Sequence, residues 1–530
     1  MLEKLVSTRL FWALVMGFRI WNALFVRTSF NPDEYWQSTE VAHRLVFGYG
    51  YLTWEWQKDA QLRGFAHPGL FAGLYKLLKL LNLDSRWAVA YGPRLFQGVL
   101  SAANDFCLYK LAHNYLDAKA AKWTLLCQLF SWFIFYVMVR PFSNCVETLC
   151  TTAALAFWPW KFLEDQAEKK KTDDISPVKR SNRTLALVFA ALGVLFRPTN
   201  AVIWLYPGLV HFLQTHDRAH LMLSVVLPIA LVTTLTMLCI DRLGYGEWTF
   251  VPFNFFKFNV LESKDKLYGE HPWNWYFSQG YPAIVGTTLP LVIAGYLTPS
   301  RKDLGRTIMW TLFVYSNASH KEFRFVLPLL PPAFVYAGYC LCKLERRLYV
   351  QVGERTQRNL LRLAILLLVV PNVLVAYYLS RSHQRAPVEV MDYLADRIRE
   401  NRDVSIHFWT PCHATPYYSF LHQNTSMWFP DCSPANRERP EGCESHQLER
   451  DPRLFLTKLY HLSPSNGQAN DSLSLALPTY VVMYSTMAAK IRPLLADIRF
   501  LETASFFHSD VSGDADSSEV VSSMLVYKRE

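Results

Sequence analysis

The chain has 530 residues, of which 51% are hydrophobic, 15% aromatic and only 18% charged. Long apolar runs with so few charges are typical of membrane spans and exclude an ordinary soluble protein. The formal net charge of +10 would suit nucleic-acid binding, but no basic face with interleaved aromatic residues occurs. Instead, the basic residues cluster between apolar runs, as in cytosolic loops, at 169–180, 301–306 and 343–362.

The apolar runs predict a polytopic α-helical membrane protein. The first run, about Leu10–Phe25, follows Lys4 and Arg9 and lacks a small-residue cleavage site, so we interpret it as a retained signal anchor. With ~20 apolar residues per span, about eleven spans are predicted. They lie near 10–27, 92–112, 123–139, 144–160, 184–197, 200–213, 219–240, 281–298, 308–318, 324–342 and 361–380.

A polar break at residues 197–200 decides the topology. If 184–213 crosses the membrane twice around this break, all three basic loops fall on the cytosolic side. If it crosses once as a single tilted span, the last two basic loops move to the lumen. We favour two crossings, which place everything after Arg381 in the lumen.

The polar tail has its own folding pattern. Val390, Met391, Leu394 and Ile398 recur at helical spacing, while Val404, Ile406 and Phe408 alternate as in a strand. Further strands are expected near 479–484, 497–507 and 521–527, with a helix near 486–495. We therefore predict a transmembrane module over 1–380, with a large first lumenal loop at 28–91, and a small lumenal α/β domain over 381–530.

Two kinds of covalent modification are expected in this tail. Asn424 and Asn470 begin glycosylation sequons, which would be used only in the lumen. Cys412, Cys432 and Cys443 are an odd number of cysteines, which in an oxidising compartment predicts one disulfide and one free thiol. The sequence leaves the pairing open.

Two adjacent carboxylates, Asp33 and Glu34, follow the first span within the string Pro-Asp-Glu-Tyr-Trp-Gln at 32–37. A carboxylate close to a low-dielectric boundary can act as a general base. The structural alternative is a helix start, because Pro32 suits the first turn and acidic residues favour the positive end of a helix.

A basic string, His-Lys-Glu-Phe-Arg-Phe, occupies residues 320–325 between two late spans. His320, Lys321 and Arg324 could hold a lipid phosphate, whereas a cytosolic basic flank is the alternative. The favoured topology places this loop in the lumen, against that alternative. Arg94 and Arg197 also stand at predicted lumenal boundaries, where they either serve a ligand or extend to the interface.

These strings resemble the lumenal mannosyltransferases of the GT-C superfamily that use dolichol-phosphate-mannose. Also similar are the segments at 49–56, 93–95 and 197–199. The Pro-Cys-His-Ala-Thr-Pro-Tyr-Tyr string at 411–418 resembles most closely the glycosylphosphatidylinositol (GPI) mannosyltransferases of the PIG-B type, which add the third mannose. One departure is Asn31, where the family pattern has His.

The resemblance implies a GT-C fold in the endoplasmic reticulum membrane and an inverting transfer that forms an α1,2 bond to a GPI glycolipid intermediate. Asp33 would be the base, and Glu34 would orient it or hold the acceptor. His320, Lys321, Glu322, Arg324, Arg94 and Arg197 would form the donor-phosphate site. Trp54, Trp56, Tyr417 and Tyr418 are candidate sugar-stacking rings, with plain packing as their alternative.

No cofactor or metal is expected, because the leaving group is a lipid phosphate and the first loop has no Asp-x-Asp. Protein partners are unknown. Two other functions stay open from the sequence. One is a mannosyltransferase of lipid-linked oligosaccharide assembly or of the fourth GPI mannose. The other is a transporter, which would usually show paired repeats.

Overall fold

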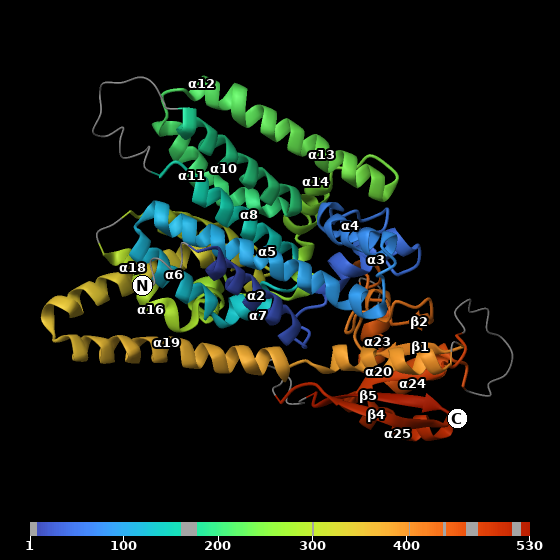
Figure 1. The fold of residues 1–530 in the computed structure, drawn as a ribbon. Helices are drawn as coiled ribbons and strands as arrows, with labels where there is room; N and C mark the ends of the chain where they lie inside the picture. Colours follow the sequence, from blue (N-terminus) through green and yellow to red (C-terminus); the bar gives the residue numbers. More distant parts are fainter. Residues whose placement is uncertain are drawn as a thin grey trace. The chain divides into compact units, whose positions relative to one another are not determined.

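The computed structural model describes residues 8–160, 177–298, 301–401, 403–437, 441–462, 475–510 and 521–530. The chain forms two compact units (Figure 1). The helical unit comprises Met1–Phe25, Glu55–Leu70 and Pro93–Ala376. The sheet unit comprises Val26–Trp54, Phe71–Gly92 and Tyr377–Glu530, so the first-loop residues on either side of Glu55–Leu70 pack with the C-terminal residues.

The helical unit is a bundle whose members follow the predicted apolar runs. Its main helices are α2 (Arg9–Phe25), α5 (Arg86–Tyr115), α6 (Ala118–Leu129), α7 (Trp132–Val137), α8 (Ser143–Phe157), α10 (Pro177–Phe196), α11 (Ala201–Gln214), α13 (Leu227–Tyr245), α16 (Leu289–Leu297), α17 (Asp303–Tyr315), α18 (Leu330–Gln351) and α19 (Glu354–Arg381). Among the described residues, four helical stretches are long and apolar enough to cross a membrane: 218–245, 276–297, 323–351 and 354–400. The predicted total of about eleven crossings stays a prediction.

One predicted span, 123–139, is not continuous. Helix α6 ends at Leu129, and Ser131 caps α7 by accepting a hydrogen bond from the backbone N–H of Ile134 (3.4 Å). The backbone N–H of Trp132 donates to Oδ1 of Asn372 (3.0 Å). These side chains satisfy N–H groups that the interruption leaves without helical acceptors, so the break is stable inside the bundle.

The predicted break at 197–200 is present and reverses the chain. Arg197 is extended between α10 and α11, and Pro198–Asn200 form a short 3₁₀ turn. At the opposite end of α10 and α11, Arg183 near the start of α10 donates two hydrogen bonds of 3.0 and 2.9 Å to the carboxylate of Asp217, just beyond the end of α11. Because the start of α10 meets the end of α11, the two helices form an antiparallel hairpin, as two crossings require.

A buried ion pair joins α2 to α5 in the helical unit. The Nε and Nη2 atoms of Arg19 donate to the two carboxylate oxygens of Asp105 at 2.7 and 3.0 Å, and neither side chain is exposed. Gln128 on α6 donates to the same carboxylate (3.1 Å), and Arg19 also donates to Asn22 (3.3 Å). The carboxylate therefore links three helices.

The tail in the sheet unit is an α/β fold, as predicted. Its five strands lie in the order β2-β1-β3-β5-β4. They are β1 (Ser405–Trp409), β2 (Ser426–Trp428), β3 (Tyr480–Tyr484), β4 (Phe500–Phe507) and β5 (Ser523–Arg529). Strand β1 is parallel to β2 and β3, whereas β5 is antiparallel to β3 and β4.

Side chains that alternate along the strands pack against helices on both faces of this sheet (Figure 1). Ile406, Val482 and Val526 pack in one cluster with apolar residues of α20 (Ala386–Glu400). Val481 and Met483 point the other way, into a cluster with α24 (Pro452–Leu459) and α25 (Ser485–Asp497). Successive strand residues face opposite sides of a sheet, so both faces are buried by helices.

The Arg19–Asp105 pair gives a stability prediction. Asp105→Ala leaves the Arg19 charge buried without its partner, and we expect the variant to lose about 3–5 kcal/mol of stability. Replacing both residues by apolar ones, Arg19→Met with Asp105→Leu, should restore most of the loss. Thermal unfolding of the purified protein in detergent measures both effects. A double variant less stable than the single one would contradict this account.

Candidate active site

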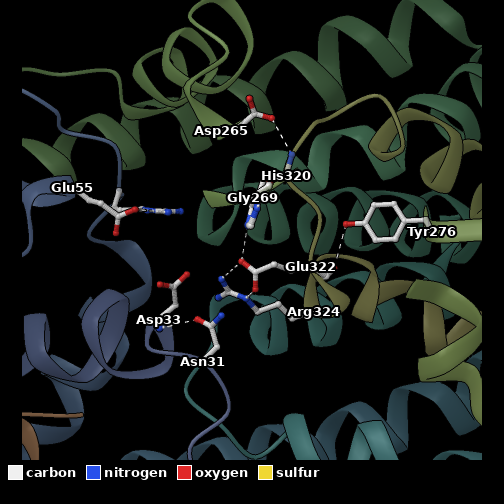
Figure 2. A network of polar contacts seen from close by, with 10 residues as sticks. Asn31, Asp33, Glu55, Asp265, Gly269, Tyr276, His320, Glu322 and Arg324 are labelled. Carbon is white, nitrogen blue, oxygen red and sulfur yellow. Dashed lines mark hydrogen bonds and ion pairs between the residues drawn. The ribbon is translucent and has the colours of Figure 1, made fainter. Parts of the chain in front are cut away.

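The first-loop carboxylates stand at the start of a helical segment in the sheet unit. Oδ1 of Asn31 accepts a hydrogen bond from the backbone N–H of Asp33 (3.0 Å, Figure 2), so Asn31 caps the turn in which Pro32 occupies the first position. Asp33 and Glu34 thus stand at a helix start, a position that leaves the proposed role of Asp33 untested, and Asn31 has a capping role at the position where the family pattern has His. The side chain of Asp33 is half-buried.

Glu34 differs from its neighbour in exposure. Its side chain is completely buried, and Oε1 accepts a weak hydrogen bond from the backbone N–H of Phe30 (3.4 Å). A carboxylate enclosed in this way can support the turn that carries Asp33, but it offers no surface to an acceptor sugar. Of the two roles considered for Glu34, orientation is the one that its burial favours.

The basic string at 320–325, in the helical unit, is organised by its one acidic member. Glu322 accepts hydrogen bonds from Nε and Nη2 of Arg324 (2.6 and 2.8 Å) and from Nε2 of His320 (3.2 Å). Figure 2 shows the Glu322 carboxylate between the two cationic side chains. Arg324 is 3% exposed and its guanidinium also lies over the ring of Phe142. The carboxylate therefore fixes the direction of both cations.

Both ring nitrogens of His320 face hydrogen-bond acceptors. Its Nδ1 faces the carbonyl oxygen of Gly269 (3.2 Å) and its Nε2 faces Glu322 (3.2 Å), an arrangement that favours the doubly protonated imidazolium form. Burial lowers the pKa of His320, but the hydrogen bond and charge of Glu322 outweigh it, so the pKa lies above its usual value. For Glu322 burial has the opposite effect and raises the pKa. The nearby charge of Arg324 outweighs burial, so the pKa of Glu322 lies below its usual value.

A preceding loop positions the string. Oδ2 of Asp265 accepts from the backbone N–H groups of Ser319 and His320 (3.0 and 3.2 Å), as Figure 2 shows for His320. The Lys321 ammonium is buried and donates to the carbonyl oxygens of His271 (2.9 Å) and Ala318. Lys321 was predicted to hold phosphate, but in this structure its bonds tie two loops together.

Arg197 has a carboxylate partner that the sequence did not reveal. Its Nε lies 3.3 Å from Oε2 of Glu147 on α8, a side chain with no exposure. The other Glu147 oxygen accepts from Nδ2 of Asn200 (3.1 Å), and the Arg197 guanidinium lies over the ring of Phe325. The hairpin turn and the basic string thus meet at one ring. Arg94 on α5 is buried at 3% exposure.

The third motif, at 411–418, is bound to the first loop inside the sheet unit. Glu40 in α3 (Glu40–Phe47) accepts from the backbone N–H groups of Tyr417 (2.7 Å) and Ser419 (3.2 Å) and from the Ser419 hydroxyl (2.6 Å). The indole N–H of Trp36 donates to the carbonyl oxygen of Thr415 (3.1 Å). Burial raises the pKa of Glu40, and these hydrogen bonds oppose the rise.

One disulfide and one free cysteine occur in the tail, as predicted. Cys412 is bonded to Cys432, and Cys443 is a buried thiol. Cys412, His413 and Cys432 also have the spacing of metal ligands, with their ligand atoms within 4.8 Å of one another. Because the two sulfurs are joined to each other, they provide no thiolate to a metal.

The four candidate stacking rings differ in exposure. Trp56 and Tyr417 are each 3% exposed and pack against neighbouring rings, so packing accounts for both. Trp54 and Tyr418 are half-buried. Tyr51, which was not among the candidates, is 41% exposed and packs on the rings of Trp36 and Phe429. Stacking by any of them stays a prediction.

Of the two sequon asparagines, Asn424 lies among the described residues. Asn424 is exposed, in the segment between α21 (Tyr418–Leu421) and β2, as a glycosylated asparagine must be. Asn470 lies outside the described residues.

The residues that sequence reasoning missed are Glu40, Glu147 and Asp265. Each is a carboxylate with at least one partner that lies 50 or more positions away in the chain. No local pattern marks such a residue. The available signal was only that Glu147 interrupts an apolar run, where an ionisable side chain needs a partner.

Known proteins with similar sequences give a consistent result. The model of the Alg9-like mannosyltransferase family matches residues 10–422. Mannosyltransferase APTG1 of Arabidopsis thaliana is 40% identical over 537 residues, covering 99% of this chain and 93% of that protein. GPI alpha-1,2-mannosyltransferase 3 of Homo sapiens is 38% identical over 519 residues, covering 97% and 86%.

Solved structures show the fold. ArnT from Cupriavidus metallidurans, bound to undecaprenyl phosphate, matches this chain with a TM-score of 0.60 at 13% identity. The match covers 98% of this chain and 97% of the ArnT chain. The Archaeoglobus fulgidus oligosaccharyltransferase has a TM-score of 0.55 at 10% identity, covering 96% and 74%. The GT-C fold is confirmed at this level. With the family match over most of its length, the chain belongs to the Alg9-like mannosyltransferase family.

Proposed function

We propose that this enzyme transfers mannose from dolichol-phosphate-mannose to the second mannose of a GPI precursor, forming an α1,2 bond in the lumen of the endoplasmic reticulum. The observation that carries the proposal is the near-full-length similarity to relatives named GPI alpha-1,2-mannosyltransferase 3. The fold of ArnT, a protein seen with undecaprenyl phosphate, is compatible with a polyprenyl-phosphate donor.

Asp33 is the proposed general base. The acceptor's 2-hydroxyl oxygen attacks the anomeric carbon of the donor and gives up its proton to the Asp33 carboxylate. The bond from that carbon to the phosphate oxygen breaks, and its electron pair leaves with dolichyl phosphate. Attack opposite the leaving group inverts the anomeric centre from β to α. Asp33 then releases its proton to water, so the enzyme returns to its starting state.

The cationic string supplies the proposed phosphate site. Imidazolium and guanidinium groups stabilise the negative charge that grows on the phosphate as it leaves. Their geometry supports this role, because Glu322 holds His320 and Arg324 in fixed directions before any ligand binds. Arg197 is a further candidate, since its guanidinium shares the ring of Phe325 with that of Arg324. Lys321 has a supporting role through its bonds to the loop carbonyls.

Loss of the protein should identify the product. Cells without it should lack GPI-anchored surface proteins and accumulate the GPI intermediate with two mannoses, because that lipid is the proposed acceptor. Lipid extraction after labelling with radioactive mannose measures the intermediate. Normal GPI lipids together with a truncated dolichol-linked oligosaccharide would instead assign the enzyme to oligosaccharide assembly.

The role of Asp33 is tested by complementation of the same cells. Asp33→Asn removes the proton acceptor and keeps the shape of the side chain, so it should abolish transfer at normal protein abundance. Glu34→Gln is the matched neighbour, and a milder loss is expected because Glu34 is buried. Substantial transfer by Asp33→Asn in microsomes would rule out the base assignment.

His320 predicts a pH dependence. A raised pKa means that the charged form predominates below it and is lost as pH rises through it. The Michaelis constant for the donor should therefore increase on the alkaline side in the wild type. His320→Gln should raise that constant about tenfold and remove this pH dependence. If the Michaelis constant for the donor still increased at alkaline pH in His320→Gln microsomes, His320 would be excluded as the origin of this pH dependence.

The exposed Asn424 tests the proposed topology. If the tail is lumenal, glycosidase treatment should lower the apparent mass of the wild-type protein on gels. Asn424→Gln should lower it by the mass of one glycan. Protease should leave the tail intact in sealed microsomes and digest it after detergent is added. Digestion in sealed vesicles would place the tail in the cytosol.

A further inference from the structure

His413 has a left-handed backbone conformation in the sheet unit. Its φ is 64°, in a region that few non-glycine residues adopt, although Asn, Asp and His are enriched there. The disulfide of the preceding Cys412 and the Trp36–Thr415 hydrogen bond restrain the loop on both sides of it. The imidazole packs on the ring of Trp36, with ring centroids 4.8 Å apart. The backbone at His413 is therefore held from both sides, and its imidazole has a fixed place against Trp36.

The same Trp36 relates His413 to the proposed base. Asp33 precedes Trp36 by three residues at the start of one helical segment, so their side chains lie on the same side of it. The Asp33 carboxylate acts electrostatically on His413 and raises the pKa of its imidazole against the larger effect of burial. The imidazole therefore lies within range of the charge of the carboxylate that would accept the hydroxyl proton.

Tyr51 and Asp431 complete the group. The Tyr51 ring packs on Trp36 and on Phe429, with centroid distances of 6.0 and 4.8 Å, and His413 packs on the same Phe429 at 5.2 Å. Asp431 acts electrostatically on both Tyr51 and His413. Two partly exposed rings, Tyr51 and His413, thus pack on a buried aromatic floor within range of two carboxylate charges. This arrangement suits a sugar with its apolar ring face and hydroxyl edge.

We propose that Asp33, Tyr51 and His413 form the subsite for the mannose that accepts the new bond, and that His413 positions this sugar's hydroxyls for Asp33. The proposal rests on the proposed function and names the residues that recognise its acceptor. Among the described residues, Nε2 of His413 has no hydrogen-bond partner, while Nδ1 lies 4.0 Å from the Cys432 sulfur. Nε2 is the atom that would contact a hydroxyl.

The charge state of His413 selects a sugar hydroxyl over a phosphate. Burial lowers the pKa of His413 to about 4, with Arg437 acting in the same direction and the two carboxylates opposing it. The imidazole is consequently neutral near neutral pH and can donate or accept a hydrogen bond. Two nearby carboxylates would repel a phosphate, so the subsite belongs to the acceptor and not to the lipid-phosphate donor.

The decisive variant is His413→Asn, because Asn tolerates the left-handed conformation and preserves the loop while removing the imidazole. Microsomes carrying it are assayed with dolichol-phosphate-mannose and the two-mannose GPI lipid, each varied in turn. The Michaelis constant for the acceptor should rise about tenfold, the cost of one hydrogen bond to a bound sugar, and that for the donor should stay unchanged.

The chain contains a matched control. His461 also has a left-handed backbone, with φ of 48°, and it is exposed in the same unit. His461→Asn repeats the substitution away from the proposed subsite and should leave both constants unchanged. Tyr51→Ala is a second test of the subsite, and it should also raise only the acceptor constant. It provides the readout should His413→Asn fail to accumulate.

Each result decides something. An acceptor constant equal to that of His461→Asn, or equal increases for acceptor and donor, would overturn the role of His413. If Asp33→Asn is inactive while His413→Asn and Tyr51→Ala are both normal, the subsite is wrong and the proposed base stands. If Asp33→Asn is active, or the product lacks a third mannose, the proposed function itself fails.

Discussion

The constraint on which the helical unit depends is that a charge buried among apolar helices must have a partner. Removing an ion from water costs several kcal/mol, and a well-placed opposite charge with additional hydrogen bonds offsets that cost. Among the buried arginines of the unit that contact carboxylates in this way are Arg19 with Asp105, Arg197 with Glu147 and Arg324 with Glu322. The first pair joins helices, and the other two fix cationic groups in the candidate phosphate site.

The same constraint explains why the site is arranged before a substrate binds. A buried arginine without a partner would turn toward water. Arg324 is instead held by two bonds to one carboxylate, and Arg197 by Glu147, which Asn200 also contacts. An anion that binds such groups does not have to order them, so less of its binding free energy is lost. Stability and ligand binding thus depend on the same contacts.

In the sheet unit, a single buried carboxylate joins two segments that are distant in the chain. Glu40 accepts hydrogen bonds from the N–H groups at the start of a short helix in the tail and so holds the 411–418 motif against the first loop. The two stretches are separated by most of the chain, but they belong to one compact unit. Segments 33–51 and 411–431 therefore form one candidate acceptor surface, even though one was predicted as a loop of the membrane module and the other as a separate domain.

The sequence by itself determined the membrane class, the helical runs, the break at 197–200 and most strands of the tail, because hydrophobic periodicity and punctuation by Pro and polar residues are local properties. It also indicated Asp33 as a candidate base and the 320–325 string as a candidate phosphate site, because a carboxylate can accept a proton and cationic side chains can bind an anion. Only the tertiary structure decided that Glu34 and Lys321 are enclosed, that Glu147 pairs with Arg197, and that His413 and Tyr51 lie around Trp36. Burial and pairing depend on residues distant in the chain, and no local pattern encodes which of them will meet.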